Sequence, residues 1–313
     1  MKKFMAVLTA LVVVSLAFTG ASLAENAEKL SVVATNFPAF DFARQVAGDC
    51  AEVAMLLPPG AESHTYEPTP RDILMIQNAD LFIYTGGESD TWVKDILSSF
   101  DHEMPVLRMI DCVAAVEEEL APGMEAEEEE EEAGAEEAEY DEHVWTSPVN
   151  AIKIEQAIAK ALQTLDPANA SAYQSNSDAY IQQLETLDQG FRDFFAGVHV
   201  KTLILGDRFP LRYFADEYGL TYYAAFPGCS TETEPSAATI AFLIDKVRTE
   251  GVSTVFYIEF SNHLVADSIA EETGVKTALI HSCHNVSQAD LDAGATYLTL
   301  MASNLETLKG AMQ

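Results

Sequence analysis

The first third of the chain alternates short apolar runs with amphipathic stretches. Residues 29–48 predict a buried strand, a turn at Pro38 and an amphipathic helix, and residues 50–60 predict a second strand that ends at two prolines and a glycine. The alternation continues through a helix, a strand, a helix and a strand at 69–80, 81–87, 91–100 and 104–111. Strands that alternate with helices predict a mostly parallel sheet with helices on both faces.

A long amphipathic helix is predicted over residues 168–197. Its apolar side chains recur every three or four residues, at Tyr173, Tyr180, Leu184, Leu187 and Phe191, and no sharp stop signal occurs before Gly197. A helix of about seven turns is long for a globular domain, so we expect it to bridge two lobes.

A second series of strands and helices follows this helix. The expected strands are at 200–207, 220–226, 252–260 and 275–282, and the expected helices are at 209–219, 234–251, 263–274 and 296–312. The predicted fold class is α/β, with two lobes that each contain a mostly parallel sheet flanked by helices and that are joined by a long rigid spine helix. We place the N-terminal lobe at residues 25–165, the interlobe spine helix at 166–197 and the C-terminal lobe at 198–313.

A run rich in glutamate interrupts the first lobe at residues 117–142. It has neither hydrophobic periodicity nor apolar bulk, which predicts a disordered loop. The run ends at His143, and helical signals resume after Pro148. His143 therefore lies between a predicted flexible loop and a predicted helix, which makes it a candidate functional residue.

Composition and charge narrow the classes of function. The 313 residues include 17 Lys and Arg against 50 Asp and Glu, a formal net charge of −33, and 48% are hydrophobic. This hydrophobic content supports a large core. The scarcity of basic residues excludes nucleic acid as a partner, because phosphate binding needs a basic face. Self-repulsion favours a monomer.

The first 24 residues are typical of a secretory signal peptide. Two lysines precede an apolar segment, and Ser22 and Ala24 occupy the small-residue positions before a cleavage site, so we expect the mature chain to begin at Glu25. No cysteine follows the apolar segment at the position of a lipid attachment site. The expected location is periplasmic or otherwise extracytoplasmic, as a diffusible protein.

The chain has four cysteines, and an even number in an exported protein predicts disulfide bonds. Four cysteines allow three pairings. We prefer the pairing that stays within each half of the chain, Cys50 with Cys112 and Cys229 with Cys283. Zinc ligation by Cys229 and Cys283 is the alternative.

Residues that can bind a metal lie where predicted strands end, and ligands of open α/β sheets bind at these ends. Four of the seven histidines occupy such connections, two in each half: His64, His143, His281 and His284. Imidazole with carboxylate oxygen suits zinc and also manganese. Although a single loop histidine is more often solvated than a ligand, this joint placement predicts a metal site between the lobes, where pockets often occur.

Two carboxylates follow strands of the second half in the same way. Asp207 follows the first of these strands and Glu259 the third. Each has a structural alternative: Asp207 can pair with Arg208, and Glu259 can cap the next helix. The sequence contains no GxSxG, no HExxH and no phosphate loop, so we do not expect an enzyme.

The chain resembles the zinc and manganese solute-binding proteins of ABC importers, the group with a rigid interlobe helix. The resemblance spans almost the whole mature chain. It rests on the segments VVATNFPAFDFARQVAGD, LLPPGAESHTYEPTPRDILMIQNADLFIYTGG, DEHVWTSPVNA, YFADEYGL, IAEETGVKTALI and TYLTLMASNLETLK.

The resemblance implies a set of metal ligands. The first two are His64, in SHTYEPTP, and His143, before the tryptophan of DEHVWTSP. The family's third histidine follows the first strand of the second lobe, where this chain has GDRFPLRYF and no histidine. The family's fourth position, often an aspartate after the last strand, is His281 here. The expected set is His64, His143 and His281, with the fourth ligand open among Asp207, Glu62, His284 and a water molecule.

Many zinc-binding members of this family carry a histidine- and acid-rich loop before the second ligand. The loop of this chain is nearly all glutamate, without a histidine of its own. Two interpretations stay open. Its carboxylates gather hard cations weakly at the mouth of the site, or the loop only keeps the protein soluble.

The resemblance also implies a function. We expect an exported protein that captures Zn²⁺ and delivers it to the membrane permease of an ABC transporter, by binding rather than turnover. Three imidazoles favour Zn²⁺ over Mn²⁺. The alternatives are a manganese or ferrous carrier of the same fold, a zinc hydrolase with water at an open fourth position, and a metal-buffering or adhesion protein.

Overall fold

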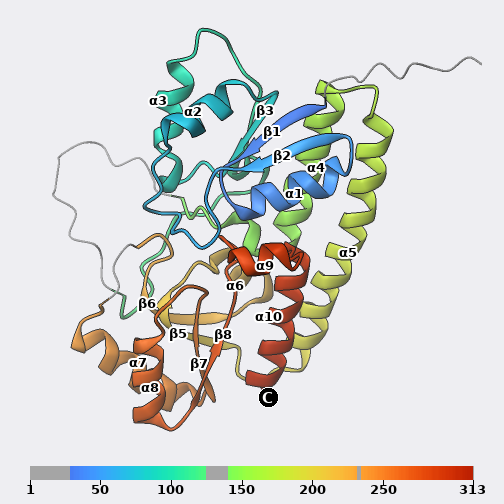
Figure 1. Cartoon of the computed structure of the whole chain (residues 1–313). Helices are drawn as coiled ribbons and strands as arrows, with labels where there is room; N and C mark the ends of the chain where they lie inside the picture. The colour runs from blue at the N-terminus through green and yellow to red at the C-terminus, as the bar shows by residue number, and fades with distance from the viewer. Residues whose placement is uncertain (1–28, 125–139, 231–233, 313) are drawn as a thin grey trace, which may run out of the picture.

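The computed structural model describes residues 29–124, 140–230 and 234–312. The signal peptide expected at residues 1–24 lies outside the described residues. Within them, two four-stranded sheets form the upper and lower parts of the molecule (Figure 1). All strand pairs in both sheets are parallel, so the predicted two-lobed α/β fold is confirmed.

The two sheets share one strand order. The first has the order β2-β1-β3-β4 and the second the order β6-β5-β7-β8. The strands are β1 (Leu30–Ala34), β2 (Ala51–Met55), β3 (Leu81–Tyr84), β4 (Val106–Arg108), β5 (Thr202–Arg208), β6 (Thr221–Phe226), β7 (Thr254–Tyr257) and β8 (Lys276–Leu279). In such sheets a ligand crevice forms beyond the carboxyl ends of the strands, where the strand order reverses.

Helices connect the strands and cover the sheets. Those of the first half are α1 (Phe37–Ala47), α2 (Pro70–Gln77), η1 (Glu88–Asp90), α3 (Trp92–Ser98), η2 (Met109–Cys112), η3 (Val144–Thr146) and α4 (Pro148–Leu165). The remaining helices are α5 (Ala170–Gly197), α6 (Arg212–Tyr218), α7 (Ala237–Glu250), α8 (Leu264–Thr273), α9 (Gln288–Asp292) and α10 (Tyr297–Ala311). Among the described residues, none of these helices is both long and apolar enough to cross a membrane.

Side-chain caps fix where several helices begin. Asn36, Thr69 and Ser147 each accept a hydrogen bond from a backbone N–H in the first turn of α1, α2 and α4, and each of these helices has a proline near its start. A cap of this kind contributes about 1 kcal/mol to helix stability, and proline at the first position has a preset φ. The caps therefore set the ends of the loops that precede these helices.

Helix α5 packs against both halves of the molecule. It contacts α1 and α4 of the first half and α6 and α10 of the second, and it runs along one side of both sheets (Figure 1). Its buried face contains the predicted apolar residues together with Phe195. Because one hydrophobic cluster contains residues of both lobes, such as Val32, Trp145 and Leu203, the core continues through the interlobe region.

The connection after β8 is fastened to the first lobe by hydrogen bonds. The indole of Trp145 donates to the carbonyl of Ser282 at 2.9 Å, and the backbone N–H of Gly60 donates to the carbonyl of Val286 at 2.8 Å. The amide of Asn285 donates to two carbonyls of the loop after β2. These contacts hold the two lobes together on either side of residue 284.

The acidic segment differs from its prediction at both ends. Residues 125–139 lie outside the described residues, but 117–124 and 140–142 have defined contacts. Glu117 forms a β-bridge with Tyr140, Glu119 pairs with Arg212 on α6, and Glu142 is only 1% exposed. The prediction of a disordered loop over 117–142 is therefore wrong at its ends, because a count of charges does not show which carboxylates find partners.

The predicted disulfides are not formed, and all four cysteines are free thiols. Cys50 precedes β2 and Cys112 follows β4, at opposite edges of the first sheet. Cys229 follows β6 and Cys283 follows β8, at opposite edges of the second. The two members of each predicted pair thus flank strands that are not neighbours in their sheet. The sequence alone does not give the order of the strands in each sheet, and the predicted pairing did not take that order into account.

One buried carboxyl on α4 has no partner. Glu155 is fully buried, and neither of its oxygens accepts or donates a hydrogen bond. Burial, with the charge of Asp41 adding to it, raises the pKa of Glu155 well above its ordinary value. The folded protein therefore favours the neutral carboxylic acid.

We expect Glu155→Gln to flatten the pH dependence of stability. Since the folded-state pKa is raised, the unfolded chain releases this proton first, and the contribution of Glu155 to stability falls as pH rises above about 4.3. Glutamine has no proton to lose, so the free energy of unfolding should gain most at high pH. Urea unfolding at several pH values measures this. Glu52→Gln, on the exposed side of β2, is the control, and an unchanged pH slope in Glu155→Gln would contradict the account.

Candidate metal centre

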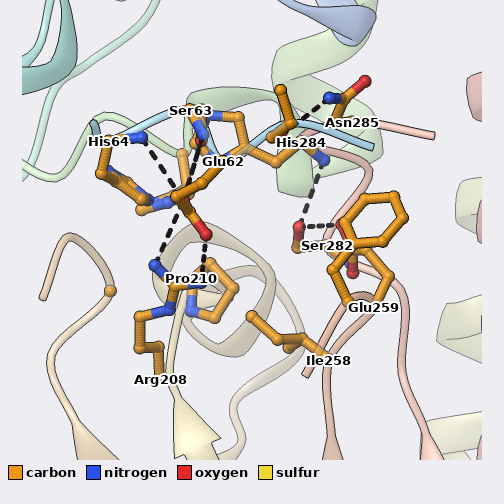
Figure 2. A pocket seen from close by; sticks show the side chains of 14 residues that line it. Glu62, Ser63, His64, Arg208, Pro210, Ile258, Glu259, Ser282, His284 and Asn285 are labelled. Atoms are coloured by element: carbon orange, nitrogen blue, oxygen red, sulfur yellow. Dashed lines mark hydrogen bonds and ion pairs between the residues drawn. The ribbon is translucent and has the colours of Figure 1, made fainter. Parts of the chain in front are cut away.

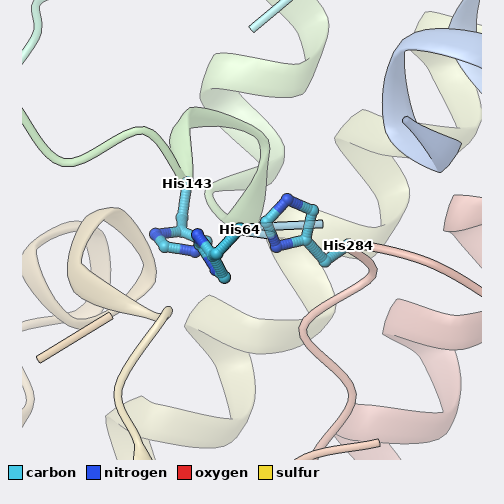
Figure 3. Close-up of side chains that lie close together, drawn as sticks. All are labelled: His64, His143 and His284. Atoms are coloured by element: carbon cyan, nitrogen blue, oxygen red, sulfur yellow. The ribbon is translucent and has the colours of Figure 1, made fainter. Parts of the chain in front are cut away.

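Three histidine side chains meet between the lobes. His64 comes from the loop after β2, His143 from the residue before η3, and His284 from the connection after β8 (Figure 3). Their ring centroids are 4.9 to 5.6 Å apart. One nitrogen of each ring lies within 4.8 Å of the others. Zn–N bonds are about 2.0–2.1 Å long, so only small shifts of the rings bring three nitrogens at this spacing onto one ion.

Local backbone structure places each ring. Gly60, at φ 79°, turns the chain after β2 toward His64. Cys283 has φ 62°, an uncommon conformation for a residue with a side chain, and it reverses the chain between His281 and His284. The carbonyl of His284 then accepts a hydrogen bond from the N–H of Phe37, the first residue of α1. The third histidine is thus presented by one lobe and anchored on the other.

Acidic side chains orient two of the rings. Nδ1 of His143 lies 3.1 Å from Asp141 Oδ1, and its other nitrogen, Nε2, is buried without a hydrogen-bond partner. Nδ1 of His64 lies 2.9 Å from the hydroxyl of Ser89 and 3.3 Å from Glu142 Oε1. A carboxylate on one ring nitrogen with the other nitrogen free is typical of metal-binding histidines. The unpartnered Nε2 calls for such an explanation.

The electrostatics of the cluster keep two rings neutral. Burial, followed by the charges of His143 and Arg208, lowers the pKa of His64 to about 3. The pKa of His284 is lowered well below its ordinary value by burial and by the charges of His64 and His143. Burial opposes the charged form of His143 too, but Asp141 outweighs it and raises the pKa. Near neutral pH, His64 and His284 therefore carry a free lone pair, the form that binds a cation.

The cluster opens into a small pocket with an ion pair at its wall. The pocket has a volume of about 30 Å³ and is lined by residues of both lobes (Figure 2). Arg208, at the end of β5, contacts Glu62 from the other lobe at 2.9 Å and also donates to the carbonyl of Ser230. This volume holds an ion and a water molecule but no organic ligand of ordinary size.

The other predicted ligands have different partners. Nδ1 of His281 accepts a hydrogen bond from the N–H of Cys283 and faces Glu259 at 3.4 Å, outside the three-histidine cluster. Asp207 accepts from the backbone N–H groups of Arg208 and Ile258. Glu259 lines the pocket, but its oxygens accept from the backbone and hydroxyl of Ser282.

The structure thus places His284, and not His281, beside the first two histidines. Both follow β8, and the sequence does not show that the chain reverses at Cys283. The orienting roles of Asp141 and Glu142 were also missed. Their signal was present in the tripeptide that ends at His143, where two acids directly precede a candidate ligand.

The chain matches one protein family over most of its length. Residues 32–311 match the family model of ZnuA, described as zinc-uptake complex component A, periplasmic. The chain belongs to the ZnuA family. The resemblance inferred from the sequence motifs is therefore confirmed, and it covers nearly all the described residues.

Two relatives of the ZnuA family illustrate the similarity. The high-affinity zinc uptake system protein ZnuA of Bacillus subtilis is 34% identical over 298 residues, which are 94% of this chain and 91% of that protein. The zinc-binding lipoprotein AdcA of Streptococcus pneumoniae is 33% identical over 283 residues, which are 90% of this chain. They are 55% of AdcA, so the chain spans about half the length of that relative.

Solved structures of the family have the same architecture. The Zn(II)-bound ZnuA-like domain of Streptococcus pneumoniae AdcA superposes with a TM-score of 0.75 at 30% identity, over 91% of this chain and 99% of that domain. The metal-dependent lipoprotein YcdH of Bacillus subtilis gives 0.76 at 32% identity, over 91% and 100%. The laminin-binding protein Lmb of Streptococcus agalactiae, an adhesin with metal transporting activity, gives 0.76 at 26%, over the same shares.

We expect Arg208→Met to raise the pKa of His64 from about 3 toward the ordinary value near 6.5. The substitution removes a positive charge that disfavours the imidazolium and leaves the carboxylate of Glu62, which favours it. Histidine titration by NMR on metal-free protein measures the change. The control is Arg248→Met, which breaks an exposed pair with Glu272 elsewhere. No movement of the His64 titration would show that Arg208 does not set its charge state.

Proposed function

We propose that the protein is an exported carrier that captures Zn²⁺ and delivers it to the membrane permease of an ABC transporter. The observation that carries the proposal is the set of three imidazoles gathered from both lobes, with the buried Nε2 of His143 free of any hydrogen bond. The names of the relatives, which describe zinc uptake and zinc binding, point to the same ion.

The proposed ligands are His64, His143 and His284. Three neutral nitrogen donors suit Zn²⁺ better than the hard ion Mn²⁺, which prefers oxygen. Glu62 lines the same pocket and is a candidate fourth ligand, after exchange of its contact with Arg208. A water molecule is the alternative, and the volume of the pocket accommodates one.

Capture and release, rather than turnover, fit this site. The pocket is too small for an organic substrate beside a bound ion. Helix α5 and the shared core connect the lobes over a long distance, so a wide hinge motion would disrupt many contacts. We infer that the ion leaves through local movement of the loops that carry His64 and His284 when the permease binds.

Zinc titration of chelator-stripped protein tests the proposal. We expect one tight site that manganese does not displace. His143→Ala and His284→Ala should each weaken binding by more than the roughly 10–100-fold typical of losing an outer-shell partner. His281→Ala should still bind zinc stoichiometrically, as should the exposed control His263→Ala.

The same titration distinguishes the alternatives. Preference for manganese over zinc would support a manganese carrier of the same fold. Only weak, multiple and salt-sensitive binding would overturn the proposal, since it would locate the metal on surface carboxylates. Tight binding that survives His284→Ala but is lost in His281→Ala would reject the ligand set.

We expect Asp141→Asn to weaken zinc binding by about 10–100-fold, because this carboxylate orients His143 and holds its Nδ1 proton. Isothermal titration with a competing chelator measures the affinity. Asp111→Asn is a suitable control, since its carboxylate makes only an exposed pair with Arg108. Equal affinity in wild type and Asp141→Asn would mean that Asp141 has no part in preparing the ligand.

A further inference from the structure

A second group of donor atoms shares His64 with the three-histidine cluster. His64, Glu142 and Cys229 each offer one donor atom, and the three atoms all lie within 4.8 Å of one another. Nδ1 of His64 faces Glu142 at 3.3 Å. The side chain of His64 is 6% exposed and that of Glu142 is 1% exposed, so the group is largely enclosed. It combines a nitrogen, an oxygen and a sulfur donor.

The loop that carries Cys229 is fitted closely to this place. It follows β6, and a Cβ atom added to Gly228 would lie 3.0 Å from Cε1 of His143, so only glycine lets the backbone approach the ring without displacing it. The backbone N–H of Cys229 donates to the carboxylate of Glu118 at 3.2 Å. The thiol is thus brought to the histidines by the close packing of Gly228 and by the hydrogen bond of its own backbone N–H.

The two described ends of the acidic segment both approach Cys229. Glu118 accepts a hydrogen bond from the backbone N–H of Cys229, and a carboxylate oxygen of Glu142 lies within 4.8 Å of its sulfur. Both residues come from the first half of the chain, whereas Cys229 comes from the second. Like the three-histidine cluster, this group therefore spans the two lobes.

The donor set indicates which ions it would bind. Thiolate, imidazole and carboxylate are the ligands of zinc sites in proteins. A thiolate is a soft ligand that Mn²⁺, Mg²⁺ and Ca²⁺ bind poorly compared with Zn²⁺. Coordination by Cys229 releases the thiol proton to solvent, with no change of oxidation state.

We propose that His64, Glu142 and Cys229 form a second metal position for thiophilic divalent cations such as Zn²⁺, next to the three-histidine site. His64 belongs to both positions. An ion held at the second position reaches the first by exchanging Glu142 and Cys229 for His143 and His284, with His64 offering a ring nitrogen at both positions. The second position is thus a step in loading or unloading, and it selects zinc against manganese. This inference rests on the proposed function, because it shares one ligand with that site.

Cobalt(II) is the probe for the test, since a thiolate bound to cobalt absorbs in the near ultraviolet whereas histidine ligands give only the weaker visible bands. We expect the wild-type protein to show the near-ultraviolet band on titration with cobalt. The band should be lost in Cys229→Ser and retained in Cys112→Ser, a thiol outside both groups. It should also persist in His284→Ala, which removes a ligand of the first position only.

The outcomes separate this inference from the proposed function. Visible bands without the thiolate band in wild-type protein would overturn the second position and leave the three-histidine site standing. No tight cobalt or zinc binding at all would overturn both.

Alkylation of the unmodified chain supplies a measurement that needs no variant: zinc should slow the reaction of Cys229 and leave that of Cys112 unchanged. Equal reaction of Cys229 with and without zinc contradicts the proposal.

Discussion

The structure depends on holding three imidazoles close together away from water. Two of them cannot carry a proton there, because burial and mutual repulsion lower the pKa values of His64 and His284. The free energy needed to hold them comes from the contacts around them: the shared core, the helix α5 and the hydrogen bonds that fasten the loop after β8 to the first lobe. A cation that binds only the folded arrangement stabilises it by mass action and offsets part of the same cost.

The pocket contains a positive side chain, that of Arg208. Where the sequence lacks the family's third histidine, Gly206 packs against the backbone of α8, Asp207 binds backbone N–H groups, and Arg208 enters the pocket. A cation at this place opposes metal binding unless it is compensated. Glu62 supplies the compensation: burial raises the pKa of its carboxyl, but the hydrogen bond and the charge of Arg208 outweigh burial and lower that pKa to about 2, so the carboxylate stays charged. The third imidazole comes instead from His284.

Much of the fold and part of the site could be predicted from the sequence. Apolar periodicity identified α5 and the alternating strands, and motif resemblance identified His64 and His143. The choice between His281 and His284 could not be made, since it depends on a left-handed residue at Cys283. The disulfide pairs failed because they depend on the order of strands in each sheet. The contacts of Glu118 and Glu142 are also made with residues far away in the sequence, so the composition of the acidic segment does not predict them.

Anomalous diffraction at the zinc edge, from crystals of the zinc-loaded protein, tests the central claim most directly. The account predicts a single strong peak between the lobes, about 2.0–2.1 Å from one ring nitrogen each of His64, His143 and His284. A weaker peak beside Cys229 would agree with the second position. A main peak at His281 and Glu259, or on surface carboxylates away from the interlobe pocket, would contradict the account.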